Sequence, residues 1–240
     1  MSLYRLILPL AALLCSGLIL EDSTVEEEIP TSKSIEQLPM EVLHVLSEFG
    51  SGAGTALNDK CAITAAHNVS GIPAANVDSL PMIVPKNHWK RLEEHSESSE
   101  DWVPLEGTRP RFRPNPIDPK LELEPGDKVL IGGFYLAKSP PQAEDFMTRR
   151  ADFVEGTVID PKSLREPLPD LVYIQVPDND YHGFCGGPAG RMDHTGKWVV
   201  FGITVVMHPS KLKQTWDNGE TKTTNISIIG ILRMPIIKRS

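Results

Sequence analysis

Cysteine is scarce in this chain, with three residues of this type among 240. Cys15 lies inside an apolar N-terminal run, so Cys61 and Cys185 would be the thiols of a processed chain. Two cysteines allow at most one bridge, which excludes the multi-disulfide frameworks of many exported proteins. The fold must therefore depend on a packed core, which a chain of this length can supply.

Basic residues are outnumbered, with 24 Lys and Arg against 32 Asp and Glu and a net charge of -8. A general nucleic-acid binder would present a basic face, so this balance argues against that class. Part of the acidic excess is local, at Glu21, Asp22 and residues 26–28. We interpret residues 21–40 as a flexible acidic linker, because a short charged run is typically solvated.

No apolar run reaches the length of a typical membrane span, which needs about 20 residues. The apolar stretch of residues 6–20 follows Arg5, is interrupted by Pro9, and contains the small residues Ser16 and Gly17. This arrangement predicts a signal peptide over residues 1–20 and a secreted or periplasmic protein, with no stable membrane span after cleavage. An uncleaved N-terminal anchor is the alternative.

Short apolar segments separated by Gly and Pro dominate the second half of the chain. Such spacing, with few helical stretches, predicts an all-β barrel or sandwich. The proline-rich residues 104–125 are expected to be irregular, since central strands do not tolerate that density of proline. They would link two halves. The predicted strands of the second half are residues 128–134, 156–159, 172–176 and 197–206.

Two short motifs, far apart in the sequence, point to nucleophilic chemistry. Residues 63–67 read Ile-Thr-Ala-Ala-His, and residues 183–188 read Gly-Phe-Cys-Gly-Gly-Pro. Histidine can take a proton from a thiol near neutral pH. Glycines permit a tight turn that aims backbone N–H groups at one point. An isolated cysteine is often only a buried hydrophobic residue, but this spacing, with a histidine upstream, favours a nucleophile.

These motifs resemble the histidine and nucleophile signatures of the chymotrypsin/trypsin-like peptidases, which read Thr-Ala-Ala-His and then Gly-Asp-Ser-Gly-Gly-Pro. The resemblance covers roughly residues 50–206. It implies an all-β fold of two six-stranded antiparallel β-barrels with the active site in the cleft between them. The peptidase domain would be residues 41–240, with an N-terminal barrel over about 41–115 and a C-terminal barrel over about 120–240.

The chain departs from the family pattern at two positions. Cys185 stands where the family has the nucleophilic serine, and a thiol beside a histidine is a competent replacement. Phe184 stands where trypsins have an aspartate that pairs with the new N-terminus after zymogen cleavage. Phenylalanine cannot form that ion pair, so we expect a site that is already formed without such cleavage.

The resemblance also implies roles for particular residues. His67 would be the general base and acid, and the backbone N–H groups of Gly183 and Cys185 would form an oxyanion hole. Asp101 opens the segment Asp-Trp-Val-Pro-Leu, which is similar to the family strand that begins with the orienting aspartate, and would fix the tautomer of His67. Asp118 is the alternate for this third group.

Residues of the specificity pocket follow by analogy. The resemblance places Asn179, Thr204 and Val205 along it, with a protein or peptide as the substrate. No metal or organic cofactor is implied. His182 and Cys185 have a three-residue spacing, but no second His/Cys pair completes a tetrahedral set.

The sequence therefore predicts an endopeptidase that acts by nucleophilic acyl transfer. The alternative is a secreted, catalytically inactive relative that binds proteins or peptides through the same cleft, because an exposed thiol is easily oxidised outside the cell. A redox-sensing thiol protein is a third hypothesis, but the sequence offers no credible resolving cysteine.

Overall fold

The computed structural model describes residues 39–48, 50–69, 71–93, 100–108, 112–135, 151–164, 167–215 and 221–235. All of them belong to one compact unit, Leu38–Ser240. The predicted signal peptide and nearly all of the predicted acidic linker lie outside the described residues. Within the described part, no helix has both the length and the apolar character that a membrane crossing needs.

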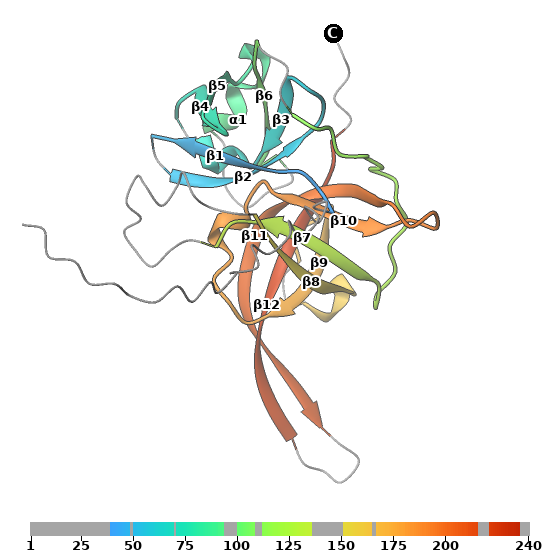
Figure 1. Cartoon of the computed structure of the whole chain (residues 1–240). Coiled ribbons are helices and arrows are strands. Elements are labelled where there is room, and N and C mark those ends of the chain that lie inside the picture. Colours follow the sequence, from blue (N-terminus) through green and yellow to red (C-terminus); the bar gives the residue numbers. More distant parts are fainter. Residues whose placement is uncertain are drawn as a thin grey trace, which may run out of the picture. The chain divides into compact units, whose positions relative to one another are not determined.

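The N-terminal barrel consists of six antiparallel strands in the closed order β1-β2-β3-β6-β5-β4 (Figure 1). Short 3-10 helices η1 and η2 and one turn of α-helix, α1, connect some of them. The bounds are β1 (Val42–Ser47), β2 (Gly50–Ala56), β3 (Cys61–Thr64), η1 (Ala66–Val69), β4 (Ala74–Val77), β5 (Leu80–Ile83), η2 (Lys86–His88), α1 (Lys90–Glu93) and β6 (Val103–Glu106).

The C-terminal barrel is likewise closed, in the order β10-β11-β12-β9-β8-β7. The two closed six-stranded antiparallel barrels confirm the expected fold class. Its elements are β7 (Lys128–Gly133), β8 (Asp152–Ile159), η3 (Pro161–Ser163), β9 (Leu171–Pro177), η4 (His182–Phe184), β10 (Pro188–Met192), β11 (Trp198–Thr215) and β12 (Thr221–Arg233).

Each barrel encloses its own apolar core, because alternate side chains of a strand point to the same side. In β8, Val154, Gly156 and Val158 are buried, and the intervening residues are more exposed. Gly156 must lack a side chain, since a Cβ there would lie 2.3 Å from Cγ2 of Ile174. A further apolar cluster joins Ile63 of the N-terminal barrel to residues of β11 and thereby packs the two barrels together.

Two predictions about strands need correction. Residues 104–125 were expected to be irregular, yet Pro104 lies in β6 and is paired with Ile63 of β3. The other neighbour, β5, pairs with β6 only at Glu106, so the missing N–H of Pro104 removes no hydrogen bond on that side. The strand expected at residues 197–206 continues to Thr215, and with β12 it forms a hairpin that extends beyond the barrel (Figure 1).

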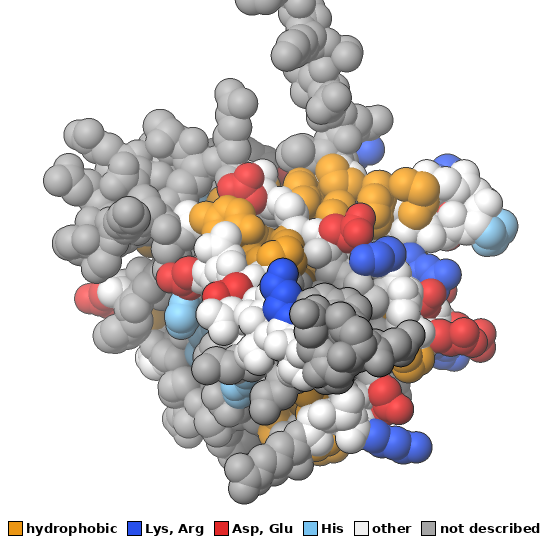
Figure 2. Space-filling view, turned by 90° about the horizontal axis from the view of Figure 1, so that it is seen from below, with side chains coloured by type: hydrophobic (Ala, Val, Ile, Leu, Met, Phe, Trp, Pro, Cys, Tyr) orange, Lys and Arg blue, Asp and Glu red, His pale blue; other side chains and the backbone are white. Residues whose placement is uncertain are grey.

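Charges of both signs are interspersed on the face of the molecule shown in Figure 2. Among the described side chains in this view, apolar residues lie between the charged ones.

Candidate active site

His67 lies in η1, immediately after β3. Ala65 and Ala66 are fully buried, and their small side chains let the chain turn tightly against the core behind the imidazole ring. Asp101 comes just before β6. Because β3 and β6 are antiparallel, with Thr64 opposite Val103, the end of β3 and the start of β6 meet at one edge of the barrel. The sheet register thus brings His67 and Asp101 together.

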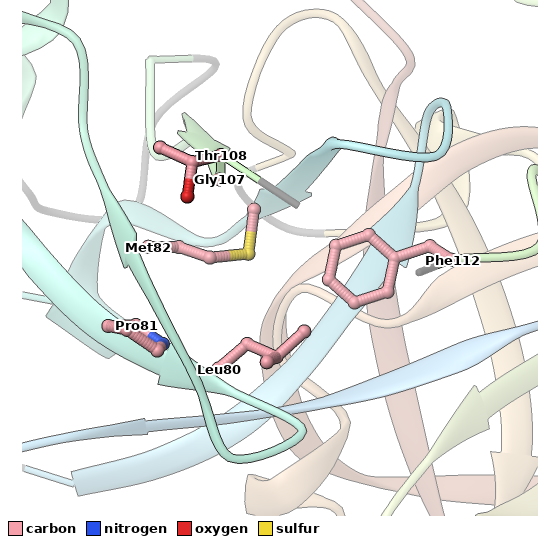
Figure 3. A pocket seen from close by; sticks show the side chains of 6 residues that line it. All are labelled: Leu80, Pro81, Met82, Gly107, Thr108 and Phe112. Atoms are coloured by element: carbon pink, nitrogen blue, oxygen red, sulfur yellow. The ribbon is translucent and has the colours of Figure 1, made fainter. Parts of the chain in front are cut away.

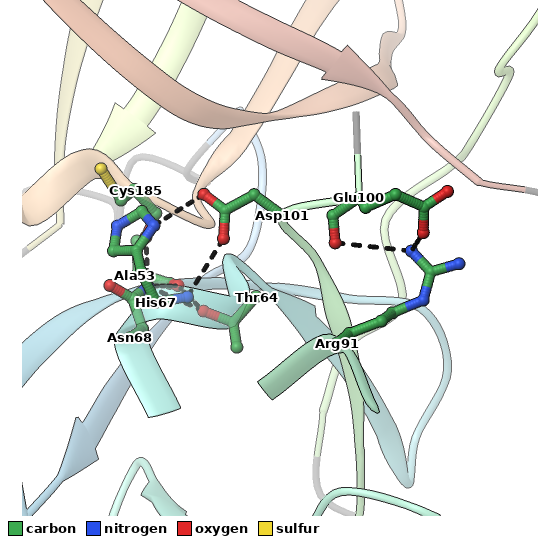
Figure 4. A network of polar contacts seen from close by, with 8 residues as sticks. All are labelled: Ala53, Thr64, His67, Asn68, Arg91, Glu100, Asp101 and Cys185. Carbon is green, nitrogen blue, oxygen red and sulfur yellow. Dashed lines mark hydrogen bonds and ion pairs between the residues drawn. The ribbon is translucent and has the colours of Figure 1, made fainter. Parts of the chain in front are cut away.

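Asp101 holds His67 at two atoms (Figure 4). His67 Nδ1 lies 2.7 Å from Asp101 Oδ2, and the backbone N–H of His67 donates to Asp101 Oδ1 at 3.1 Å. The carboxylate is only 2% exposed, so water hardly competes for it. An Nδ1–H that donates to a carboxylate leaves Nε2 available for chemistry in the cleft.

The electrostatics of this group favour a protonated ring. Burial lowers the pKa of His67, but hydrogen bonds to Asp101 and Cys185, with the negative charges of both, raise it to about 10. The contact with the buried carboxylate of Asp101 therefore stabilises the protonated form of the ring.

The segment that carries Asp101 is anchored on both sides by one cation. Arg91 of α1 forms an ion pair with Glu100 at 2.5 Å (Figure 4). Its guanidinium also lies 4.1 Å from the ring centre of Trp102. Trp102 is itself nearly buried. Arg91 therefore contacts the residues immediately before and after Asp101.

Cys185 follows η4 and is buried, with 9% of its surface exposed. The next residue, Gly186, has a φ of +86°, a region that disfavours residues with a side chain. A Cβ at Gly186 would also lie 2.2 Å from the carbonyl oxygen of Ala53. A Cβ at Gly187 would lie 2.0 Å from the carbonyl oxygen of Gly132. The two glycines of the motif therefore allow the loop to lie directly on neighbouring backbone.

Hydrogen bonds fix this nucleophile loop (residues 183–187) to both barrels. The N–H of Gly186 donates to the carbonyl of Thr204 at 2.7 Å, and the N–H of Ala53 donates to the carbonyl of Cys185 at 2.9 Å. The hydroxyl of Thr55 donates to the carbonyl of Gly186 at 3.0 Å. The loop is thus held by β11 of its own barrel and by β2 of the other.

An aromatic cluster anchors the start of the loop. Phe184 is fully buried, and its ring lies 5.1 Å from that of Tyr135 and 5.2 Å from that of Tyr181, both edge to face. Such edge-to-face packing is favourable beyond area burial alone. Gly133 makes room for it, because a Cβ there would lie 2.3 Å from Cγ of Phe184. Phe184 thus holds the loop by packing, without an ion pair.

A cavity of about 260 Å³ opens over these groups. Its lining combines the reactive side chains with an apolar wall from β11: His67, Asp101, His182, Cys185, Val205, Val206 and Met207. A second cavity of about 300 Å³ lies in the N-terminal barrel (Figure 3). The described residues that line this second cavity are Leu80, Pro81, Met82, Gly107, Thr108 and Phe112. None of these described side chains is titratable, so we assign the chemistry to the first cavity.

The structure brings His67, Asp101 and Cys185 together in the lining of one cavity, and Gly183 precedes Cys185 by two residues. The alternate acid, Asp118, instead accepts a hydrogen bond from the backbone N–H of Lys120 and does not line this cavity.

The three residues expected in the specificity pocket are placed differently from one another. Val205 lines the cavity. Thr204 is 1% exposed behind it, and its hydroxyl has no hydrogen-bond partner among the described residues. Asn179 is exposed after β9, and its side-chain oxygen accepts from the N–H of Asp180.

Some residues of the cavity were not assigned there from the sequence. Val206 and Met207 continue the strand that contains Val205, so the strand pattern could have indicated one of them. His182 was considered only as a metal ligand. It lies at the rim of the cavity, where its Nδ1 is 2.5 Å from Asp180 Oδ1. In the described ranges, no group of three or more His, Cys, Asp or Glu side chains is arranged to hold a metal.

Both described cysteines are free thiols. Burial and the charge of Glu106 raise the pKa of Cys61 to about 11, so this thiol stays protonated at neutral pH. Cys61 is therefore an internal reference for an unactivated thiol, which reacts slowly.

The sequence matches no protein-family model and no curated protein. Among solved structures, the chain is similar to the active form of the Rv3671c protease from M. tuberculosis, with 15% identity, a TM-score of 0.47, and coverage of 81% of this chain and 76% of that one. It is also similar to the MamO protease domain from Magnetospirillum magneticum, with 17% identity, a TM-score of 0.46, and coverage of 83% and 94%. The corresponding values for kallikrein-related peptidase 10 are 12%, 0.48, 80% and 89%. Likenesses this remote carry no information on activity.

Proposed function

We propose that this protein is an endopeptidase with a thiol nucleophile. The observation that carries the proposal is the position of His67, which is bonded to the buried carboxylate of Asp101 and lines one cavity together with Cys185. A nucleophile, a base and an orienting acid in this order form a complete acyl-transfer apparatus.

In the first half of the reaction, His67 takes the proton from Sγ of Cys185, and the thiolate attacks the carbonyl carbon of a peptide bond in the cavity. The negative charge then develops on the carbonyl oxygen, which the N–H groups of Gly183 and Cys185 would bind. The imidazolium returns its proton to the leaving amine as the C–N bond breaks. A thioester to Cys185 remains.

In the second half, a water molecule replaces the departed amine. His67 accepts one proton from this water, whose oxygen attacks the thioester carbonyl. Collapse of the second tetrahedral intermediate breaks the C–S bond, and the proton returns from His67 to the sulfur. Asp101 keeps Nδ1 protonated throughout and stabilises the imidazolium, so Nε2 can shuttle the proton.

The substrate would be an extended peptide that lies along β11. Residues 205–207 of β11 form the apolar wall of the cavity beside Cys185, so an uncharged apolar side chain suits the site best. Aromatic packing of Phe184 holds the nucleophile loop in place of the ion pair that zymogen cleavage creates in trypsins. The proposed enzyme is therefore active without proteolytic activation, in the secreted or periplasmic compartment that residues 1–20 predict.

The test uses the chain from residue 21 onward under mild reducing conditions. A mixed peptide library is followed by mass spectrometry, and the same experiment is run with Cys185→Ala and with Cys61→Ala as the matched control. We expect cleavage by the wild type and by Cys61→Ala, and none by Cys185→Ala or after pre-alkylation with iodoacetamide. No cleavage, together with alkylation of Cys185 as slow as that of Cys61, would overturn the proposal and favour the inactive binding protein.

A further inference from the structure

The side chain of Asn68 spans the two barrels at the point where the reacting groups meet. Asn68 follows His67 in η1 and is 6% exposed. Its Nδ2 donates to the carbonyl oxygen of Cys185 at 2.7 Å and to Oγ1 of Thr64 at 2.9 Å. One amide group therefore links the turn of the base to the backbone of the nucleophile (Figure 4).

The surrounding groups determine the orientation of this amide. The Cys185 carbonyl can only accept, and the Thr64 hydroxyl already donates to the carbonyl of Ala53 at 2.7 Å. Asn68 must therefore present its NH₂ group to both, with one hydrogen for each. An aspartate at this position would have the same shape but, when ionised, no hydrogen to donate.

The backbone around Asn68 leaves little room for another arrangement. A Cβ at Gly52 would lie 2.4 Å from Nδ2 of Asn68, so the amide occupies space that a side chain on β2 would need. The N–H of Ala53 binds the same Cys185 carbonyl at 2.9 Å. The carbonyl is thus held by β2 and by η1, both of which belong to the N-terminal barrel.

We infer that Asn68 is a positioning residue that aligns Cys185 with His67. Among the described strands, no hydrogen-bonded pair joins one barrel to the other, so the sheets alone do not set the distance from imidazole to thiol. Asn68 provides that link from the residue adjacent to the base. A misplacement of about 1 Å between reacting groups costs on the order of 10²-fold in rate. The inference rests on the proposed function for its kinetic test, but not for its labelling test.

The kinetic test compares Asn68→Asp and Asn68→Ala with Asn115→Asp. Asn115 provides the matched control, because its amide is likewise buried and bonds the backbone of Glu41, but none of its described hydrogen bonds reaches the nucleophile loop. We expect kcat to fall about 10–100-fold in both Asn68 variants with KM within about threefold, and to fall less than about threefold in Asn115→Asp. Equal losses in all three variants would indicate a merely structural role and would overturn the inference.

The labelling test measures alkylation of Cys185 by iodoacetamide as a function of pH in folded protein, with Cys61 as the internal reference. We expect fast labelling near neutral pH in the wild type and in Asn115→Asp. In both Asn68 variants, labelling slows and its pH dependence moves toward that of an ordinary thiol. An unchanged profile in these variants would overturn the inference. A wild type that cleaves no peptide but shows the expected labelling pattern would refute the peptidase proposal alone.

Discussion

The substitution Asp101→Asn tests the catalytic reasoning most directly. The native carboxylate accepts from both Nδ1 and the backbone N–H of His67, at 2.7 and 3.1 Å. An amide of the same shape can present its NH₂ group to Nδ1, which then becomes an acceptor. The ring proton moves to Nε2, which faces the cleft, and the imidazole can no longer accept the proton of Cys185.

The size of the effect follows from two losses. The wrong tautomer removes the base, and the pKa of His67 falls from about 10, because burial continues to lower it while the hydrogen bond and charge of Asp101 are gone. Because a thiol is a stronger acid and a better nucleophile than a hydroxyl, some reaction persists. We expect kcat/KM to fall about 10²–10³-fold, which corresponds to roughly 3–4 kcal/mol of transition-state stabilisation.

The assay is kcat/KM against pH with a peptide identified in the library experiment. Asp118→Asn is the matched control, since it makes the same chemical change at the alternate acid, whose carboxylate binds only the backbone N–H of Lys120 in the described contacts. We expect it to change kcat/KM less than about twofold. An Asp101→Asn enzyme with a wild-type rate and pH profile would refute the reasoning, and a larger loss in Asp118→Asn would transfer the role to Asp118.

Three further predictions concern stability and support of the site. Phe184→Ala should lower the free energy of unfolding in urea by about 3–5 kcal/mol, because the ring is fully buried, and a loss below about 1 kcal/mol would contradict the aromatic anchor. Arg91→Met retains apolar contact with Trp102 but loses the cation, so kcat/KM should fall about tenfold, whereas unchanged kinetics would exclude a role in holding Asp101. Because the pKa of His67 is raised in the folded protein, its protonation adds to the free energy of unfolding. This contribution is fully present below pH about 6.5 and is lost as the pH rises through about 10. His67→Gln should remove this part of the pH dependence of the free energy of unfolding. Identical dependence on pH in the wild type and in His67→Gln would contradict the prediction.

The local sequence was informative wherever chemistry requires particular residues at adjacent positions. The glycines after Cys185 were readable as a tight turn, and the structure shows Gly186 at positive φ against the backbone of another strand. The histidine motif after a short strand was equally readable, because small residues must pack behind the ring. Short apolar segments separated by Gly and Pro predicted an all-β barrel or sandwich, and the two barrels were implied by the family resemblance. Pro104 in β6 shows that one proline is tolerated where a strand lacks a second partner.

Which residues contact His67 and Cys185 depends on segments that are far apart in the sequence. The resemblance favoured Asp101 over Asp118, whose surroundings are proline-rich, and the register of β3 with β6 places Asp101 on His67. Asn68 carried no local signal for its role, because its acceptor is a backbone carbonyl 117 residues away.

The sequence by itself therefore determined the all-β class, the two reactive motifs and the absence of a disulfide framework, since periodicity, turn chemistry and cysteine number are local or additive properties. Only the tertiary structure decided which acid contacts His67, how Phe184 anchors the nucleophile loop, and how that loop is hydrogen-bonded to the opposite barrel. Each of these features depends on contacts between groups that are far apart in the sequence and come together only in the folded barrels. A local sequence pattern does not specify such contacts.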